Sequence, residues 1–172
     1  PSEPAALRAA LAAAPAGPGW VVLVHGLATT EGSWCVGAAD RFGDPASTLG
    51  ARLQAERGWV PLYVRYNTGR TVGANGAALS ARLAQVAAAL DAVGRGGERW
   101  TLIGHSMGGL VSREAVGLAA RGADPWLARV PAAVCLGSPH HGAPLAKLAG
   151  GAQLALDQIP TPGAAIPAAI LA

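Results

Sequence analysis

The chain has 172 residues, a length that fits one domain. Hydrophobic residues make up 51% and charged residues 13%, which excludes a disordered segment and leaves enough apolar material for a buried core. The net charge of +3 comes from basic residues scattered along the chain, so the sequence predicts no nucleic-acid partner. No run reaches the roughly 18 apolar residues of a membrane span, and no signal-peptide pattern opens the chain.

Two elements are predicted at the start of the chain. Residues 4–14 are rich in alanine and place Leu7 and Leu11 one helical turn apart, which predicts a short helix. Residues 20–24 (WVVLV) form a short apolar run rich in β-branched residues, which indicates a strand buried on both faces of a parallel sheet. Residues 28–47 then predict a long loop.

The middle of the chain predicts two helices and two strands. Residues 49–57 predict a helix, and residues 59–66 (WVPLYVRY) predict a second strand. A long helix is expected over residues 74–93, because apolar residues recur at steps of four and three along one face. Residues 100–103 (WTLI) predict a third strand.

The remaining elements complete an α/β pattern. A helix is expected to end near Arg121, residues 131–136 predict a fourth strand, and the tail gives no clear strand. Four strands alternating with helices predict an α/β fold with a doubly wound, mostly parallel sheet. We divide the chain into an N-terminal helix and linker (1–19), an α/β core (20–149) and a proline-containing tail (150–172).

The clearest chemical motif is G-x-S-x-G from Gly104 to Gly108, with Ser106 at its centre. A serine hydroxyl becomes a useful nucleophile when a base removes its proton and the backbone holds it clear of its surroundings. A tight turn between a strand and a helix holds the hydroxyl clear in this way, and the crowding within the turn favours glycine on both sides of the serine. Because a predicted strand precedes the motif and a predicted helix follows it, we predict that Ser106 is the nucleophile.

A second motif, His25-Gly26-Leu27, follows the first predicted strand. Functional residues gather at the carboxyl ends of parallel strands, so this motif is expected beside Ser106. The attacked carbonyl oxygen becomes negative, and backbone N–H groups stabilise it; we predict those of Leu27 and Met107 as the oxyanion hole. The His25 side chain is expected to order the loop, because a histidine before the serine breaks the chain order of this chemistry.

Two other side chains are interpreted as structural. The geometry of the turn points His105 away from Ser106, and we expect His105 to pack against its surroundings. Cys135 lies in an apolar run and is expected to be a small buried hydrophobe. A disulfide between Cys135 and Cys35 stays open, and with it the redox compartment.

Three blocks resemble the bacterial lipase and esterase branch of the α/β-hydrolases, which includes triacylglycerol lipases and GPI-inositol-deacylase-like hydrolases. The blocks are residues 22–27 (VLVHGL), 102–113 (LIGHSMGGLVSR) and 136–147 (LGSPHHGAPLAK), in the order of the family. Residues 66–70 (YNTGR) also resemble a segment of some bacterial members.

This resemblance implies a serine hydrolase. It implies that Ser106 cleaves carboxylic esters through an acyl-enzyme, with Leu27 and Met107 as the oxyanion hole and without a metal or cofactor. The expected partner is a small-molecule or lipid ester, so contact with a membrane surface stays open, although no amphipathic segment indicates it.

The sequence offers no suitable acid and histidine to complete the family's catalytic triad. The family order is serine, acid, histidine, and no histidine follows Asp157. Asp124 precedes His140 and His141, but we expect it at the opposite end of the sheet from the serine. His140 is expected to be structural.

Three interpretations therefore stay open. The first is that the chain is the front part of a longer lipase or esterase whose later strands supply the acid and histidine, so that the isolated chain is poorly active. The second is a non-catalytic binding module on a hydrolase-like fold. The third is an acyltransferase or thioesterase, which the same turn also serves.

Overall fold

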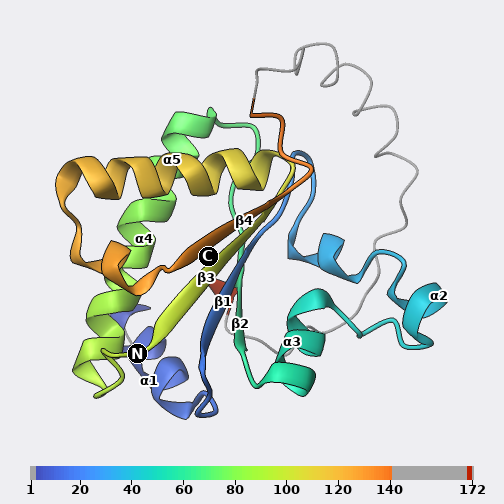
Figure 1. Ribbon diagram of the computed structural model, residues 1–172, viewed down its shortest axis with the longest axis horizontal. Coiled ribbons are helices and arrows are strands. Elements are labelled where there is room, and N and C mark those ends of the chain that lie inside the picture. The colour runs from blue at the N-terminus through green and yellow to red at the C-terminus, as the bar shows by residue number, and fades with distance from the viewer. Residues whose placement is uncertain (1–2, 141–169, 172) are drawn as a thin grey trace.

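The computed structural model describes residues 3–140 and 170–171. Its centre is a parallel sheet with the strand order β4-β3-β1-β2-β5 (Figure 1). The strands are β1 (Gly19–Val24), β2 (Val60–Val64), β3 (Arg99–His105), β4 (Ala132–Leu136) and β5 (Ile170–Leu171). The predicted α/β fold with a parallel sheet is confirmed. The prediction of no strand in the tail is wrong for β5, whose two residues are too few to produce a pattern.

Helices cover both faces of the sheet (Figure 1). One face carries α1 (Glu3–Ala13), α4 (Val72–Ala92) and α5 (Met107–Gly122), and the other carries α3 (Leu49–Arg57), with α2 (Ala38–Phe42) further out. Each face has its own apolar core, and Trp20, Val22 and Val24 of β1 face the larger one. All six residues of β1 are buried, which confirms the prediction of a strand covered on both faces.

The segment predicted as a long loop is more ordered than its sequence indicated. Residues 28–47 contain the 3₁₀ helix η1 (Glu31–Cys35) and the helix α2, each of five residues. The Thr30 side chain accepts from the Gly32 N–H at 3.3 Å and caps η1. The loop prediction was wrong there because helices this short show no apolar period.

The outer strand β4 also departs from expectation. All five of its residues are exposed, including Val134 and Cys135, because the described sheet has no strand beyond it. The prediction that Cys135 is buried is therefore wrong. Cys35 and Cys135 are both free thiols, so the open question of a disulfide is answered in the negative.

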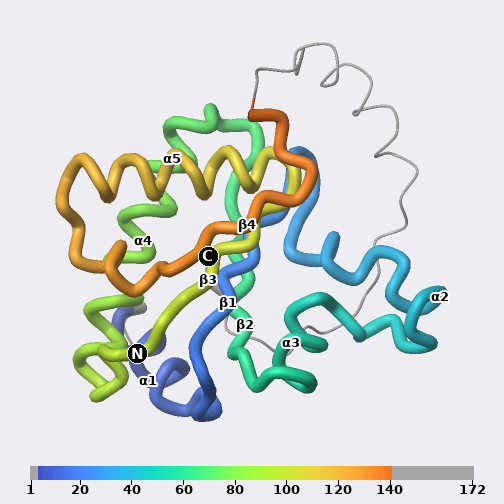
Figure 2. The backbone as a smooth tube through the Cα atoms, in the orientation of Figure 1, coloured from blue at the N-terminus to red at the C-terminus, as the bar shows by residue number. Residues whose placement is uncertain are grey.

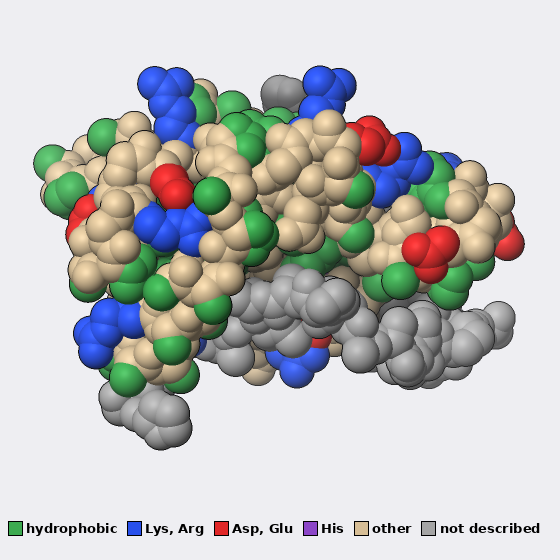
Figure 3. Space-filling view, turned by 90° about the horizontal axis from the view of Figure 1, so that it is seen from below, with side chains coloured by type: hydrophobic (Ala, Val, Ile, Leu, Met, Phe, Trp, Pro, Cys, Tyr) green, Lys and Arg blue, Asp and Glu red, His purple; other side chains and the backbone are tan. Residues whose placement is uncertain are grey.

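The fold brings several strand ends to one place. In Figure 2 the carboxyl ends of β1, β3 and β4 converge on the first turn of α5. The strand register agrees, since Val24 pairs with Gly104 and His105 pairs with Leu136. The 3₁₀ helix η2 (Pro125–Arg129) lies at the other end, between α5 and β4. On the face shown in Figure 3, basic side chains are spread out and form no stripe.

Candidate active site

Ser106 forms the turn between β3 and α5 and has a strained backbone. Its φ of 52° and ψ of −120° lie in a region that residues with a side chain seldom adopt, at a cost of about 1–3 kcal/mol. Two backbone bonds hold the turn: the Ser106 N–H donates to the Leu136 carbonyl at 2.8 Å, and the Gly109 N–H donates to the Ser106 carbonyl at 3.1 Å. The half-buried Ser106 side chain is thus presented at the carboxyl edge of the sheet.

Glycines surround this turn because nothing larger fits. A Cβ atom on Gly104 would lie 2.5 Å from the Cα and N atoms of Gly109. A Cβ atom on Gly108 would collide with the carbonyl oxygens of Val24 and His25. The crowding predicted from the G-x-S-x-G spacing is confirmed, and Gly108 is what lets α5 begin directly against the end of β1.

The His25-Gly26-Leu27 segment lies against the nucleophile. A Cβ atom on Gly26 would be 3.3 Å from the Cβ of Ser106 and 3.2 Å from Nδ1 of His105. The N–H groups of Leu27 and Met107 donate no hydrogen bond to any residue in the described part of the chain. The structure therefore brings these two predicted residues to the turn of Ser106, and their oxyanion-hole role stays a prediction.

His25 is fully buried and bonded within its own loop. Its Nδ1 lies 3.0 Å from the Gly26 carbonyl oxygen, and its ring stacks on Tyr66 with centroids 4.4 Å apart. Burial lowers the pKa of His25, and the nearby positive charge of Arg65 adds to this, whereas the Gly26 hydrogen bond partly opposes it. His25 is thus a neutral ring that packs beneath the loop, as its predicted loop-ordering role requires.

The segment after β2 supplies contacts that the sequence did not predict. The Tyr66 hydroxyl donates to the His25 carbonyl at 2.7 Å, and burial raises the pKa of Tyr66. The Ala28 N–H donates to Thr68 Oγ1 at 3.1 Å. In the sequence, only the resemblance of residues 66–70 to a family segment pointed to this region, and it assigned no role to Tyr66 or Thr68.

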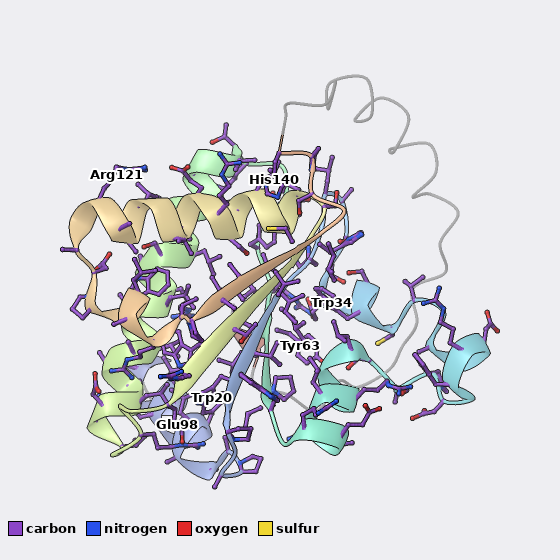
Figure 4. The ribbon with its side chains drawn as sticks, viewed as in Figure 1. Trp20, Trp34, Tyr63, Glu98, Arg121 and His140 are labelled. Carbon is purple, nitrogen blue, oxygen red and sulfur yellow. The ribbon has the colours of Figure 1, made fainter. Side chains whose placement is uncertain are left out.

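Two aromatic neighbours also lie at this edge. His105 is exposed, and its ring lies edge-on to the half-buried ring of Trp34, with centroids 6.5 Å apart. Figure 4 labels Trp34. The expectation that His105 packs is therefore met through one contact and not through burial. Ser138 packs over Gly109, and its buried Oγ has no partner among residues 3–140.

Neither His140 nor Asp124, the two described candidates for a triad, forms a hydrogen bond with Ser106. His140 is exposed, and its Nδ1 lies 3.3 Å from the Arg113 guanidinium (Figure 4). Asp124 follows the far end of α5, which at 1.5 Å per residue is about 24 Å from Ser106 for 16 residues. The prediction that Asp124 lies at the opposite end is confirmed. Asp157 and His141 lie outside the described residues.

Other sites are not indicated in the described part of the chain. Residues 3–140 and 170–171 contain no group of three or more side chains that could hold a metal ion. None of the helices described there is both long and apolar enough to cross a membrane. A cavity of about 290 Å³ lies between α4 and the end of β2, where Tyr66 and Arg65 line it, but Ser106 does not.

Comparison with known proteins identifies the family. The matching family model is described as a PGAP1-like alpha/beta domain, and it covers residues 20–155. No curated protein and no solved structure matches the chain. The matched range contains the Ser106 turn and the His25-Gly26-Leu27 segment, and the relationship points to a hydrolase-like fold and a hydrolase-type function. Because the match spans more than half of its length, the chain belongs to the PGAP1-like alpha/beta domain family.

Proposed function

We propose that this protein is a serine hydrolase of carboxylic esters, of the lipase and esterase type, with Ser106 as its nucleophile. The observation that carries the proposal is the strained Ser106 backbone, φ 52°, at a strand-to-helix turn against which Gly26 packs. A backbone held in such a region at a cost is a mark of functional sites. The substrate is a small-molecule or lipid ester.

The chemistry proceeds through an acyl-enzyme. A base takes the Ser106 proton while Oγ attacks the ester carbonyl carbon, and the carbonyl oxygen becomes negative. The N–H groups of Leu27 and Met107, which have no acceptor within the described residues, stabilise this oxygen. Collapse of the intermediate expels the alcohol, which takes the proton from the base. Water, deprotonated by the same base, then attacks the acyl group, releases the acid and restores the Ser106 hydroxyl. In this proposal the base and its orienting acid come from outside residues 3–140.

A fluorophosphonate probe tests the proposal directly, because it reacts with activated serine hydroxyls. We expect the probe to label Ser106 in the complete protein, where the base and the acid are present, and the Ser106→Ala variant to remain unlabelled, as judged by mass spectrometry of the peptide. Ser112→Ala is the matched control: Ser112 lies on α5, the helix that follows Ser106, and its buried hydroxyl donates to the Gly108 carbonyl at 2.8 Å. Labelling that persists in Ser106→Ala would contradict the assignment.

The same assay separates the alternatives. A folded complete protein with no labelling at any probe concentration would favour a non-catalytic binding module. For an active chain, an added alcohol or thiol that captures the acyl group faster than water does would favour an acyltransferase or thioesterase activity.

A further inference from the structure

We propose that the segment after β2, residues 65–68, positions the oxyanion loop, residues 25–31, and that Tyr66 is its main positioning residue. This inference rests on the proposed function, because it assigns a task to the Leu27 N–H. The contacts that carry it join two segments about 40 residues apart in the sequence. We call residues 65–68 the β2 tail.

Tyr66 fixes the first peptide unit of the loop. Its hydroxyl donates to the His25 carbonyl at 2.7 Å, and its ring stacks on the His25 ring at 23° between planes. A peptide unit is planar, so fixing the His25 carbonyl also fixes the direction of the Gly26 N–H. Tyr66 thus holds both the backbone and the side chain of His25.

The second peptide unit is fixed from within the loop. The Gly26 carbonyl lies 3.0 Å from His25 Nδ1 and accepts from the Thr29 hydroxyl at 2.9 Å. The Leu27 N–H belongs to this same unit and points opposite to the Gly26 carbonyl. Two hydrogen bonds therefore aim the Leu27 N–H, and one of them comes from the ring that Tyr66 supports.

The third unit and the following turn are tied to the β2 tail again. Ala28 has a φ of 53°, a strained value for a residue with a side chain, and its N–H donates to Thr68 Oγ1 at 3.1 Å. The buried Glu31 carboxylate then accepts two hydrogen bonds from the Arg65 guanidinium, one of them at 2.8 Å from Nε. The tail thus holds the loop at three points.

The β2 tail is itself held rigid. The side chain of Asn75, a buried residue of α4, donates from Nδ2 to the Asn67 carbonyl at 3.0 Å and to the Arg70 carbonyl at 3.3 Å. The chain after β2 is therefore anchored to a long helix and cannot follow the loop if the loop moves. A rigid support of this kind is what an aimed hydrogen-bond donor requires.

Tyr66→Phe tests the proposal, with Tyr63→Phe as its matched control. Both tyrosines lie on or next to β2 and lose one hydroxyl hydrogen bond, but Tyr63 bonds Thr48 Oγ1 at 2.5 Å on the opposite face of the sheet (Figure 4). We expect Tyr66→Phe to lower the maximal rate of fluorophosphonate labelling about 10-fold. The probe concentration for half-maximal rate should stay within twofold, and Tyr63→Phe should change the rate less than twofold. Thr68→Val should lower the maximal rate of labelling by about threefold.

Amide hydrogen exchange supplies a readout that does not depend on reactivity. Loosening the loop should speed exchange of the Ala28 N–H in Tyr66→Phe and in Thr68→Val, but not in Tyr63→Phe. Unchanged labelling and unchanged Ala28 exchange in folded Tyr66→Phe would overturn the inference. If the complete wild-type protein is not labelled, the proposed function fails, and Ala28 exchange alone decides whether the β2 tail holds the loop.

Discussion

The two ends of the sheet are built in different ways. At the amino end, Arg95 donates to the carbonyls of Leu11, Ala14 and Pro15 at 2.6 to 3.0 Å. Its guanidinium also pairs with Glu98 at 2.8 Å and lies 4.8 Å from the centre of the Trp20 ring. Figure 4 shows Trp20 and Glu98 together at this end, far from His140.

The carboxyl end carries strain and unused donors. Ser106 and Ala28 both have positive φ values, and the N–H groups of Leu27 and Met107 have no acceptor in the described structure. Each strained residue costs free energy. The amino end also holds one, Ala123 at the C-cap of α5, which has a φ of 51°. The contrast lies in the arrangement: at the amino end one guanidinium ties several elements together, whereas the carboxyl end holds two strained residues, one of which is the candidate nucleophile.

Breaking the amino end should give the largest loss of stability. Arg95→Ala removes several hydrogen bonds and leaves the half-buried Glu98 without its cation, so we expect the free energy of unfolding to fall by about 3 kcal/mol in urea titrations. The exposed pair of Arg121 with Glu114 is the control, and Arg121→Ala should cost less than about 1 kcal/mol. Labelling of Ser106 per folded molecule should not change; a large fall would show that the two ends are coupled.

Breaking the carboxyl end should cost less stability and more reactivity. The added methyl of Gly108→Ala would push the start of α5 away from the carbonyls of Val24 and His25. We expect the free energy of unfolding to fall by about 2 kcal/mol and the labelling rate by about 100-fold. Gly73→Ala is the control: its Cβ meets nothing within 4 Å in α4, and it should stabilise the protein by about 0.5–1 kcal/mol. Full reactivity of Gly108→Ala would refute the tight packing at this turn.

The smallest effect should come from the pH dependence of stability. Burial lowers the pKa of His25 below its ordinary value of 6.5, so the unfolded state binds a proton more readily than the folded state does. Stability is therefore full above pH 6.5 and should decline as the pH falls toward the folded pKa. Urea titrations at several pH values should show a shallower decline for His25→Asn; an equal slope in both proteins would mean that other groups cause it.

Local patterns in the chain were enough to predict the centre of the sheet and the turn at Ser106. The apolar runs that become β1 and β3 are short and end just before the two motifs. The G-x-S-x-G spacing predicted close packing at the turn, and Gly104 and Gly108 show it. The helices η1 and α2 and the two-residue strand β5 were missed because they are too short to show a period. The exposure of Cys135 depends on which elements lie beside β4, and the residues of β4 alone do not predict this.

The sequence by itself determined the nucleophile candidate, the loop beside it and the α/β fold, because each follows from neighbouring residues that shape one another directly. Only the tertiary structure decided what supports the loop. Tyr66 and Thr68 contact His25 and Ala28 across about 40 residues of chain, through hydrogen bonds that exist only once β1 and β2 lie side by side. Such contacts depend on strand order and register, and no local spacing encodes them.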